Sequence, residues 1–137
     1  MAVRSSLLTS ALVGVLMAGA AHVFAQAPGI REVTASDRSV IPLNTRLRYT
    51  TMIVLPDGEE ILDVICGDRD FWVISAVQNV AHVKPAKSGT ETNLNLVTAR
   101  GTIYSFLLSE KSSGSATQVA ADLKVYVTAD PATPVTL

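Results

Sequence analysis

No constellation of catalytic residues stands out in this sequence, and histidine and cysteine are scarce. Of its two histidines, only His82 lies beyond the first 25 residues, and strand alternation places it on an outer face beside Val80 and Lys84. A histidine in that position is favoured as a surface residue over a metal ligand or a general base. The single cysteine, Cys66, alternates with apolar residues and is favoured as a small core residue over a reactive thiol.

Motifs that would assemble a catalytic or cofactor site are also missing from the sequence. It has no serine elbow, no metal-binding spacing of histidine or cysteine, and no glycine loop of the kind that holds phosphate. We therefore expect no enzymatic activity, no catalytic or cofactor-binding residues and no metal site.

Two pairs of acidic residues invite a different interpretation, because hard cations such as calcium bind clustered oxygen ligands. Glu59 and Glu60 are adjacent, and Asp68 and Asp70 flank Arg69. A calcium site or an acid-base pair is one alternative. An ordinary polar turn is the favoured one, since Arg69 supplies a counter-charge within the second group.

The first 25 residues have the layout of a secretory signal peptide. The positive charge of Arg4 precedes an uncharged run that extends to Ile30 and has an apolar centre. We predict cleavage between Ala25 and Gln26, because a cut two residues later would leave Pro28 at the new terminus. A membrane-spanning helix is the alternative, but glycine and histidine interrupt the apolar centre. We expect an exported periplasmic protein with no direct membrane span.

Charge and length limit the function classes further. The chain has 11 Lys and Arg against 12 Asp and Glu, and removal of the segment that holds Arg4 leaves 10 against 12, a net charge of −2. That balance argues against nucleic-acid binding, which needs a concentrated basic face. The mature length allows one domain with one core. With a single cysteine there is no internal disulfide, so the apolar core alone must hold the fold.

Beyond the signal peptide, apolar and polar residues alternate with a period of two, and turn-forming residues such as Pro56–Glu59 separate short runs. The predicted strands are Leu47–Leu55, Glu60–Cys66, Trp72–Val77, Val80–Pro85, Asn93–Thr98, Ile103–Leu108 and Asp122–Thr128. About seven short antiparallel strands without a convincing helix predict an all-β chain that forms a single small β-sandwich.

The alternation also predicts which side chains share a face. The sets are Leu47, Tyr49, Thr51, Ile53 and Leu55; Leu62, Val64 and Cys66; Trp72, Ile74 and Ala76; Tyr104, Phe106 and Leu108; and Leu123, Val125 and Val127. Trp72 is expected to anchor the core rather than to stack on a ligand. For the domain organisation we expect a signal peptide at 1–25, an extended segment with the first edge strand at 26–45, the sandwich at 46–128 and a linker-like tail at 129–137.

Several short segments, in a fixed order, resemble one family. They are Val54–Ile61, Gly67-Asp68 followed by Trp72, Val83–Pro85, Thr92–Leu94 and Tyr104–Leu108. In this order they resemble the N-terminal domain of the TrbG/CagX conjugal-transfer family, over about Arg46 to Val127. The resemblance implies a periplasmic component that assembles in many copies into the outer-membrane core complex of a type IV secretion system. It implies a TrbI-like scaffold protein, a small lipoprotein and copies of the chain itself as partners. Members of the family usually continue into a second β domain.

The residues leave a second function open. A sandwich exposes strand edges that can add a partner's strand, so a β domain without a catalytic site is suited to protein binding. A stand-alone periplasmic binding module for a peptide or a glycan is therefore the alternative to a structural part of a secretion machine, and an enzyme is a third, less favoured hypothesis.

Overall fold

The structure is a computed structural model that describes residues 28–112 and 119–131. These residues form nine strands and no helix. The strands are β1 (Ile30–Ala35), β2 (Val40–Thr45), β3 (Thr51–Val54), β4 (Ile61–Cys66), β5 (Trp72–Val77), β6 (Val80–Pro85), β7 (Glu91–Thr98), β8 (Ile103–Glu110) and β9 (Lys124–Ala129). The predicted signal peptide and the end of the predicted tail lie outside the described residues.

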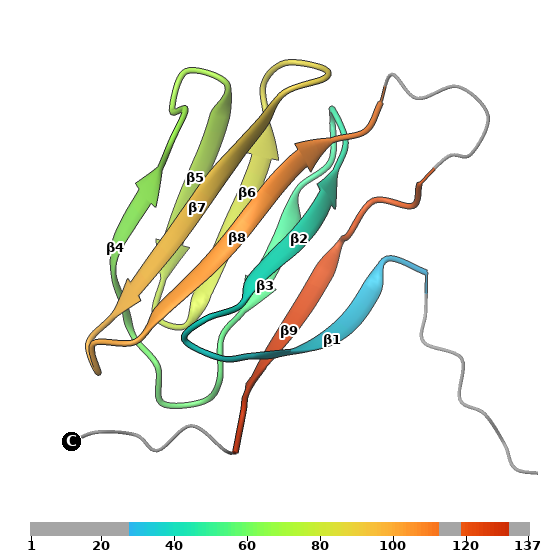
Figure 1. The fold of residues 1–137 in the computed structure, drawn as a ribbon. Coiled ribbons are helices and arrows are strands. Elements are labelled where there is room, and N and C mark those ends of the chain that lie inside the picture. The colour runs from blue at the N-terminus through green and yellow to red at the C-terminus, as the bar shows by residue number, and fades with distance from the viewer. Residues whose placement is uncertain (1–27, 113–118, 132–137) are drawn as a thin grey trace, which may run out of the picture.

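The strands of the described part of the chain form two sheets that pack face to face (Figure 1). The five-stranded sheet has the order β1-β9-β3-β6-β5, and the four-stranded sheet has the order β2-β8-β7-β4. The edge strands β1 and β2 lie together at one side of the sandwich, while β4 and β5 lie together at the other (Figure 1). Every strand edge that a partner could reach therefore belongs to one of these two sides.

The predicted all-β sandwich is confirmed, and the structure differs from the expectation in strand number and direction. Two strands, β1 and β2, lie in the segment where one edge strand was expected. β1 pairs in parallel with β9, and β2 pairs in parallel with β8. The β3–β9 pairing is parallel as well, whereas the remaining pairings are antiparallel. Turn residues predict antiparallel hairpins, but parallel pairing joins segments that are distant in sequence and leaves no local signal.

The core lies between the sheets and is formed by alternate residues of the strands, as the period of two predicted. Its buried apolar residues are Ala35, Ile41, Leu43, Ile53, Leu55, Trp72, Ala81, Val83, Leu94, Leu96, Tyr104, Phe106, Leu108, Val125 and Val127. The predicted turn after β3 is present, because Glu59 N donates to Pro56 O at 3.1 Å and Gly58 has a φ of 82°. Glycine is favoured at Gly58 because that φ is left-handed.

The first predicted strand begins too early. A turn occupies the residues before Thr51, since Arg48 has a φ of 72° and Tyr49 N donates to Arg46 O at 3.2 Å. Tyr49 is 51% exposed and does not share the buried face of Thr51 and Ile53. Leu123, just before β9, is likewise exposed, unlike the buried Val125.

A β-bulge corrects the predicted face of β4. The register of β4 against β7 shifts between Ile61 and Asp63, so Leu62 falls out of phase. Leu62 is 66% exposed, while Ile61, Val64 and Cys66 pack against the core. An extra residue in a strand moves all side chains on one side of the insertion to the opposite face of the sheet. The alternation of apolar and polar residues does not reveal such an insertion.

Candidate functional site

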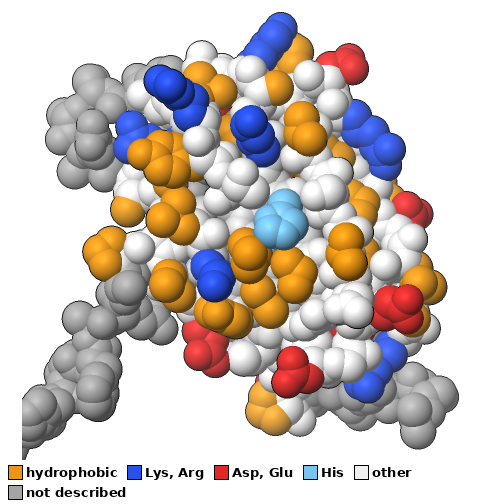
Figure 2. Space-filling view, turned by 180° about the vertical axis from the view of Figure 1, so that it is seen from behind, with side chains coloured by type: hydrophobic (Ala, Val, Ile, Leu, Met, Phe, Trp, Pro, Cys, Tyr) orange, Lys and Arg blue, Asp and Glu red, His pale blue; other side chains and the backbone are white. Residues whose placement is uncertain are grey.

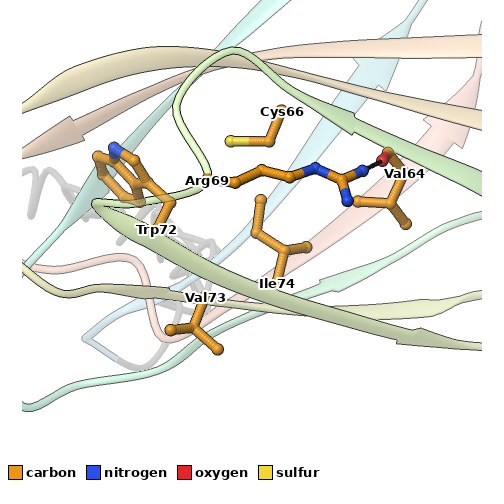
Figure 3. Close-up of a pocket in the computed structure, with 6 residues that line it drawn as sticks. All are labelled: Val64, Cys66, Arg69, Trp72, Val73 and Ile74. Atoms are coloured by element: carbon orange, nitrogen blue, oxygen red, sulfur yellow. Dashed lines mark hydrogen bonds between the residues drawn. The ribbon is translucent and has the colours of Figure 1, made fainter.

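A cavity of about 310 Å³ lies where the edges of the two sheets approach each other at β4 and β5. The residues that line it are Val64, Cys66, Arg69, Trp72, Val73 and Ile74. In Figure 3 the side chain of Arg69 extends along the cavity toward Val64, between Cys66 of β4 and Ile74 of β5. The lining is thus mostly apolar, with one cationic group.

Arg69 comes from the short connection between β4 and β5. Its Nη2 donates to Val64 O at 2.5 Å, which holds the guanidinium against the edge of β4 (Figure 3). Val64 N donates to Asp63 Oδ1 at 2.8 Å. Among the described residues, no carboxylate lies within ion-pair distance of Arg69. The positive charge at the cavity therefore has no anionic partner in the described part of the chain.

Two side chains, Trp72 and Cys66, line the less exposed part of this cavity. Trp72 is 2% exposed and forms its inner wall, and Cys66 is half-buried. The indole Nε1 of Trp72 is buried and has no hydrogen-bond partner among the described residues. A mostly apolar cavity with one cation is suited to hold an apolar group next to a polar or anionic one.

The opposite side of the sandwich is closed by Asp122. Its Oδ1 accepts from Arg31 Nε at 2.8 Å, and its Oδ2 accepts from Arg31 Nη2 at 3.2 Å and from Asn44 N at 2.8 Å. Asp122 N donates to Asn44 O at 2.8 Å, and Asp122 O accepts from the hydroxyl of Thr51 at 2.5 Å. The guanidinium of Arg31 also donates to Pro42 O. The carboxylate of Asp122 thus joins β1 and β2, and its backbone carbonyl holds Thr51 of β3.

A second buried carboxylate, Glu110, joins three connections at one end of the sandwich. It accepts hydrogen bonds from the backbone N–H groups of Leu47 at 3.1 Å, Gly89 at 2.7 Å and Ser112 at 2.8 Å. Burial acts to raise the pKa of Glu110, but the hydrogen bonds from Ser112, Gly89 and Leu47 outweigh it and lower the pKa below its ordinary value. The ionised carboxylate is therefore the form that the fold stabilises.

Glu59 and Tyr104 meet at the other end of the core. Tyr104 Oη donates to Glu59 Oε1 at 3.3 Å, and both side chains are buried. Burial, followed by the charge of Glu59 and this hydrogen bond, raises the pKa of Tyr104 to about 12, while Arg100 acts in the opposite direction. Glu59 Oε2 and the hydroxyl of Thr98 are buried without a hydrogen-bond partner among the described residues.

The predicted polar residues occupy separate places. Glu59 is buried against Tyr104, whereas Glu60 is exposed. Asp68 Oδ1 accepts from Asp70 N at 3.2 Å, which is the contact of a polar turn. Within residues 28–112 and 119–131, no group of three or more His, Cys, Asp or Glu residues is placed to hold a metal ion.

His82 lies on the outer face of the five-stranded sheet, as predicted, opposite Met52 and Ser75 in the neighbouring strands. Figure 2 shows this face, on which hydrophobic side chains gather around a histidine. One row of residues that pair across the sheet consists of Val77, Val80, Val54 and Tyr126. The face is thus partly apolar. In the described part of the chain no helix is long and apolar enough to cross a membrane.

Sequence reasoning missed the structural roles of Arg69, Asp122 and Glu110. Each acts through backbone groups that are distant in sequence or lie on a strand edge. Only the tertiary pairing brings those backbone groups within reach. The one signal in the sequence is that Asp122 is the first residue of the predicted strand Asp122–Thr128.

Comparison with known proteins assigns the chain to a family. No curated protein matches it significantly. A family described as CagX, conjugal transfer protein, matches residues 28–134, which include every strand of the described residues. The match covers more than half of the chain and confirms the resemblance found from its short segments. The chain therefore belongs to the CagX family of conjugal transfer proteins.

Proposed function

We propose that this chain is a non-enzymatic structural component of a type IV secretion or conjugal-transfer machine, and that it acts in the periplasm through contacts with other core-complex proteins. The observation that carries the proposal is the family match over residues 28–134, which spans the whole described sandwich. The proposed partners are a TrbI-like scaffold protein, a small lipoprotein and further copies of the chain. The predicted signal peptide supports the periplasmic location.

The architecture is suited to such a role. Each side of the sandwich offers strand edges, and the outer face of the five-stranded sheet carries exposed apolar side chains such as Val77 and Tyr126. Edges and partly apolar sheet faces are the features through which β domains bind other proteins. The proposed activity therefore needs only contacts between proteins and no chemical step.

Affinity purification from the native envelope tests this proposal. The full chain, tagged at its C-terminus and produced from its own locus, is purified after mild chemical crosslinking. We expect the secretion-core proteins to co-purify with the chain. We also expect the intact mass of the chain to equal that of a mature protein whose first residue is Gln26. The control is an equally tagged, exported β-sandwich of unrelated family. Recovery of the chain without any core protein would contradict the proposal.

The cavity between β4 and β5 favours one second candidate, a stand-alone periplasmic module that binds a peptide or a glycan. Its mostly apolar lining suits an extended peptide with an apolar side chain. Arg69, which has no carboxylate within ion-pair distance among the described residues, suits an acidic side chain of the same peptide. The same purification separates the two functions. Capture of a soluble peptide or glycan, with no core protein, would favour the binding module.

A further inference from the structure

The edges of the four-stranded sheet are occupied by groups of the same chain. In β2, Pro42 has no N–H group and its carbonyl oxygen accepts from Arg31. The next outward residue, Asn44, uses both backbone groups, because its N–H donates to Asp122 Oδ2 and its C=O accepts from Asp122 N. Added strands need free N–H and C=O groups, so β2 is blocked.

The other edge of this sheet, β4, is blocked at its centre by similar means. Val64 N donates to Asp63 Oδ1 and Val64 O accepts from Arg69 Nη2. The bulge between Ile61 and Asp63 further interrupts the regular spacing of outward groups. Bulges and charged side chains are the usual means by which natural sheets prevent strand addition.

The edge strand β5 of the five-stranded sheet has no such protection. Phe71 O accepts from Ala86 N, so the odd-numbered residues of β5 make the ladder bonds to β6. The backbone groups that face away from β6 belong to Trp72, Ile74 and Ala76. No side chain of the described residues bonds to them, and this strand contains neither proline nor a charged residue.

The edge strand β1 at the far end of the same sheet is equally free. The carbonyl oxygens of Gly29 and Ala35 accept from the segment of β9, so the odd-numbered residues again face inward along the ladder. The residues whose backbone groups face away from β9 are Ile30, Glu32 and Thr34. Within the described residues, no side chain bonds to these groups either.

We propose that the free edge of β5 in one copy pairs with the free edge of β1 in the next copy, so that the five-stranded sheet continues from copy to copy. This inference rests on the proposed function and names the surface through which copies associate. The two edges lie at opposite ends of one sheet, and β1, β9, β3 and β5 run in the same direction. Head-to-tail repetition of such a unit pairs the two edges in parallel and generates a ring or an open array.

Residues of opposite charge lie near the two edges. On the outer face, Glu32 is the only charged residue of β1, and Lys84 is the only lysine, arginine or carboxylate of β5 and β6. In the joined sheet, β5 of one copy lies between its own β6 and β1 of the next copy, so β6 and that β1 would be about 10 Å apart. The side chains of Lys84 and Glu32 are long enough to span this distance. The exposed Val73 and Val77, 61% and 72% accessible, would be partly covered by β1 of the next copy.

Paired cysteines test this interface in the full chain. In a Cys66→Ala background, Glu32→Cys is combined in turn with Val73→Cys, Ser75→Cys and Val77→Cys. These are the three positions of β5 whose side chains lie on the outer face of the sheet, as that of Glu32 does. The variants are oxidised in intact cells that contain the whole machine. We expect at least one combination to give dimers, trimers and longer species on a non-reducing gel, because each copy then carries both halves of the link.

Single-cysteine variants and a matched pair on the blocked edges serve as controls. Val40→Cys with Ile65→Cys places cysteines at exposed positions on the outer face of β2 and β4, and this pair should give no ladder. Strong dimers from Val73→Cys alone would show that two β5 edges meet each other, and would overturn the proposal. Crosslinks only to a different protein would overturn it in favour of a foreign strand.

A backbone variant gives an independent readout. Thr34→Pro removes one N–H group of β1 that faces away from β9, and it keeps the hydrogen bonds between β1 and β9. It should lower the yield of crosslinked dimers and longer species about tenfold. Thr34→Ala keeps this N–H group and should leave the yield of crosslinked species unchanged. If no pair forms a ladder while the core proteins still co-purify, the inference fails and the proposed function stands. If the core proteins are lost as well, the proposed function fails.

Discussion

Asp122 joins three strands through hydrogen bonds of its carboxylate and its backbone. Its carboxylate holds Arg31 and Asn44, and its backbone holds Asn44 and Thr51. Hydrogen bonds to charged groups contribute more to stability than hydrogen bonds between neutral groups. If the carboxylate of Asp122 is lost, the guanidinium of Arg31 stays partly removed from water without an ionic partner, which costs free energy. Asp122 therefore has a structural role in closing one side of the sandwich.

We expect Asp122→Asn to lower the free energy of unfolding by about 1–3 kcal/mol, because the amide cannot accept the two hydrogen bonds from Arg31 as a carboxylate does. Urea unfolding at neutral pH measures the change. Asp37→Asn, at an exposed position, is the control and should change stability by no more than about 0.5 kcal/mol. Equal stability of the two variants would contradict a role for Asp122 in closing this side.

Glu110 makes the stability of the fold depend on pH in the acid range. Its pKa is lower in the folded protein than its ordinary value of 4.5, so the ionised carboxylate stabilises the folded state above that value. This contribution is lost as the pH falls through the folded-state pKa. We expect Glu110→Gln to destabilise the protein by about 1–2 kcal/mol at neutral pH.

Unfolding curves of both proteins, recorded from neutral pH into the acid range, measure this effect. The difference between the wild-type protein and Glu110→Gln should shrink as the pH falls, because protonation abolishes the advantage of the carboxylate. Glu32→Gln, at an exposed position, is the control and should change stability at neutral pH by no more than about 0.5 kcal/mol. A difference that stays constant with pH would show that Glu110 acts by its shape and not by its charge.

At the scale of the strands, the sequence predicted β5 and β6 with their observed bounds, and it predicted the inward residues of β8. These strands follow a strict period of two between clear turn residues. The face of β4 was predicted wrongly because the bulge after Ile61 inserts a residue. The sequence predicted a single edge strand where β1 and β2 lie, because their partners β9 and β8 are far away in sequence. Hydrophobic alternation fixes the facing of a strand but not its neighbour.

Trp72 and Phe106 test the predicted core faces. Both are buried, in β5 and β8 respectively. Replacement of either by Ala should cost about 3–5 kcal/mol, because the surrounding core cannot fill the volume that is removed. Against a total of about 5–15 kcal/mol for a domain, that loss is large enough to unfold much of the population.

Thermal and urea unfolding measure these two variants, with Val73→Ala as the control in β5. Val73 is largely exposed and points to the opposite face, so its truncation should change stability by no more than about 0.5 kcal/mol. A Trp72→Ala protein that unfolds at the wild-type temperature would show that Trp72 does not anchor the core.

The two sheets of the molecule differ in how their edges are protected, and this difference could not be predicted from the sequence. Pro42 in an edge strand is a recognisable signal. The contacts of Arg69 with Val64 and of Asp122 with Asn44 depend on how the sheets pack. Period and turn residues therefore predicted a sandwich without predicting which of its edges remain available.

Amide hydrogen exchange, followed by NMR, tests this difference over the whole molecule. In the isolated chain, the amides of Ile74 and Ala76 should exchange rapidly because they face the free edge, while those of Val73 and Ser75 should be protected by the ladder to β6. Asn44 also lies on an edge strand, but its N–H donates to Asp122, so it should be protected as well. Rapid exchange of Asn44, or equal protection of all β5 amides, would contradict the assignment of blocked and free edges. In assembled protein the alternation along β5 should disappear, because β1 of the next copy supplies acceptors for the outward N–H groups.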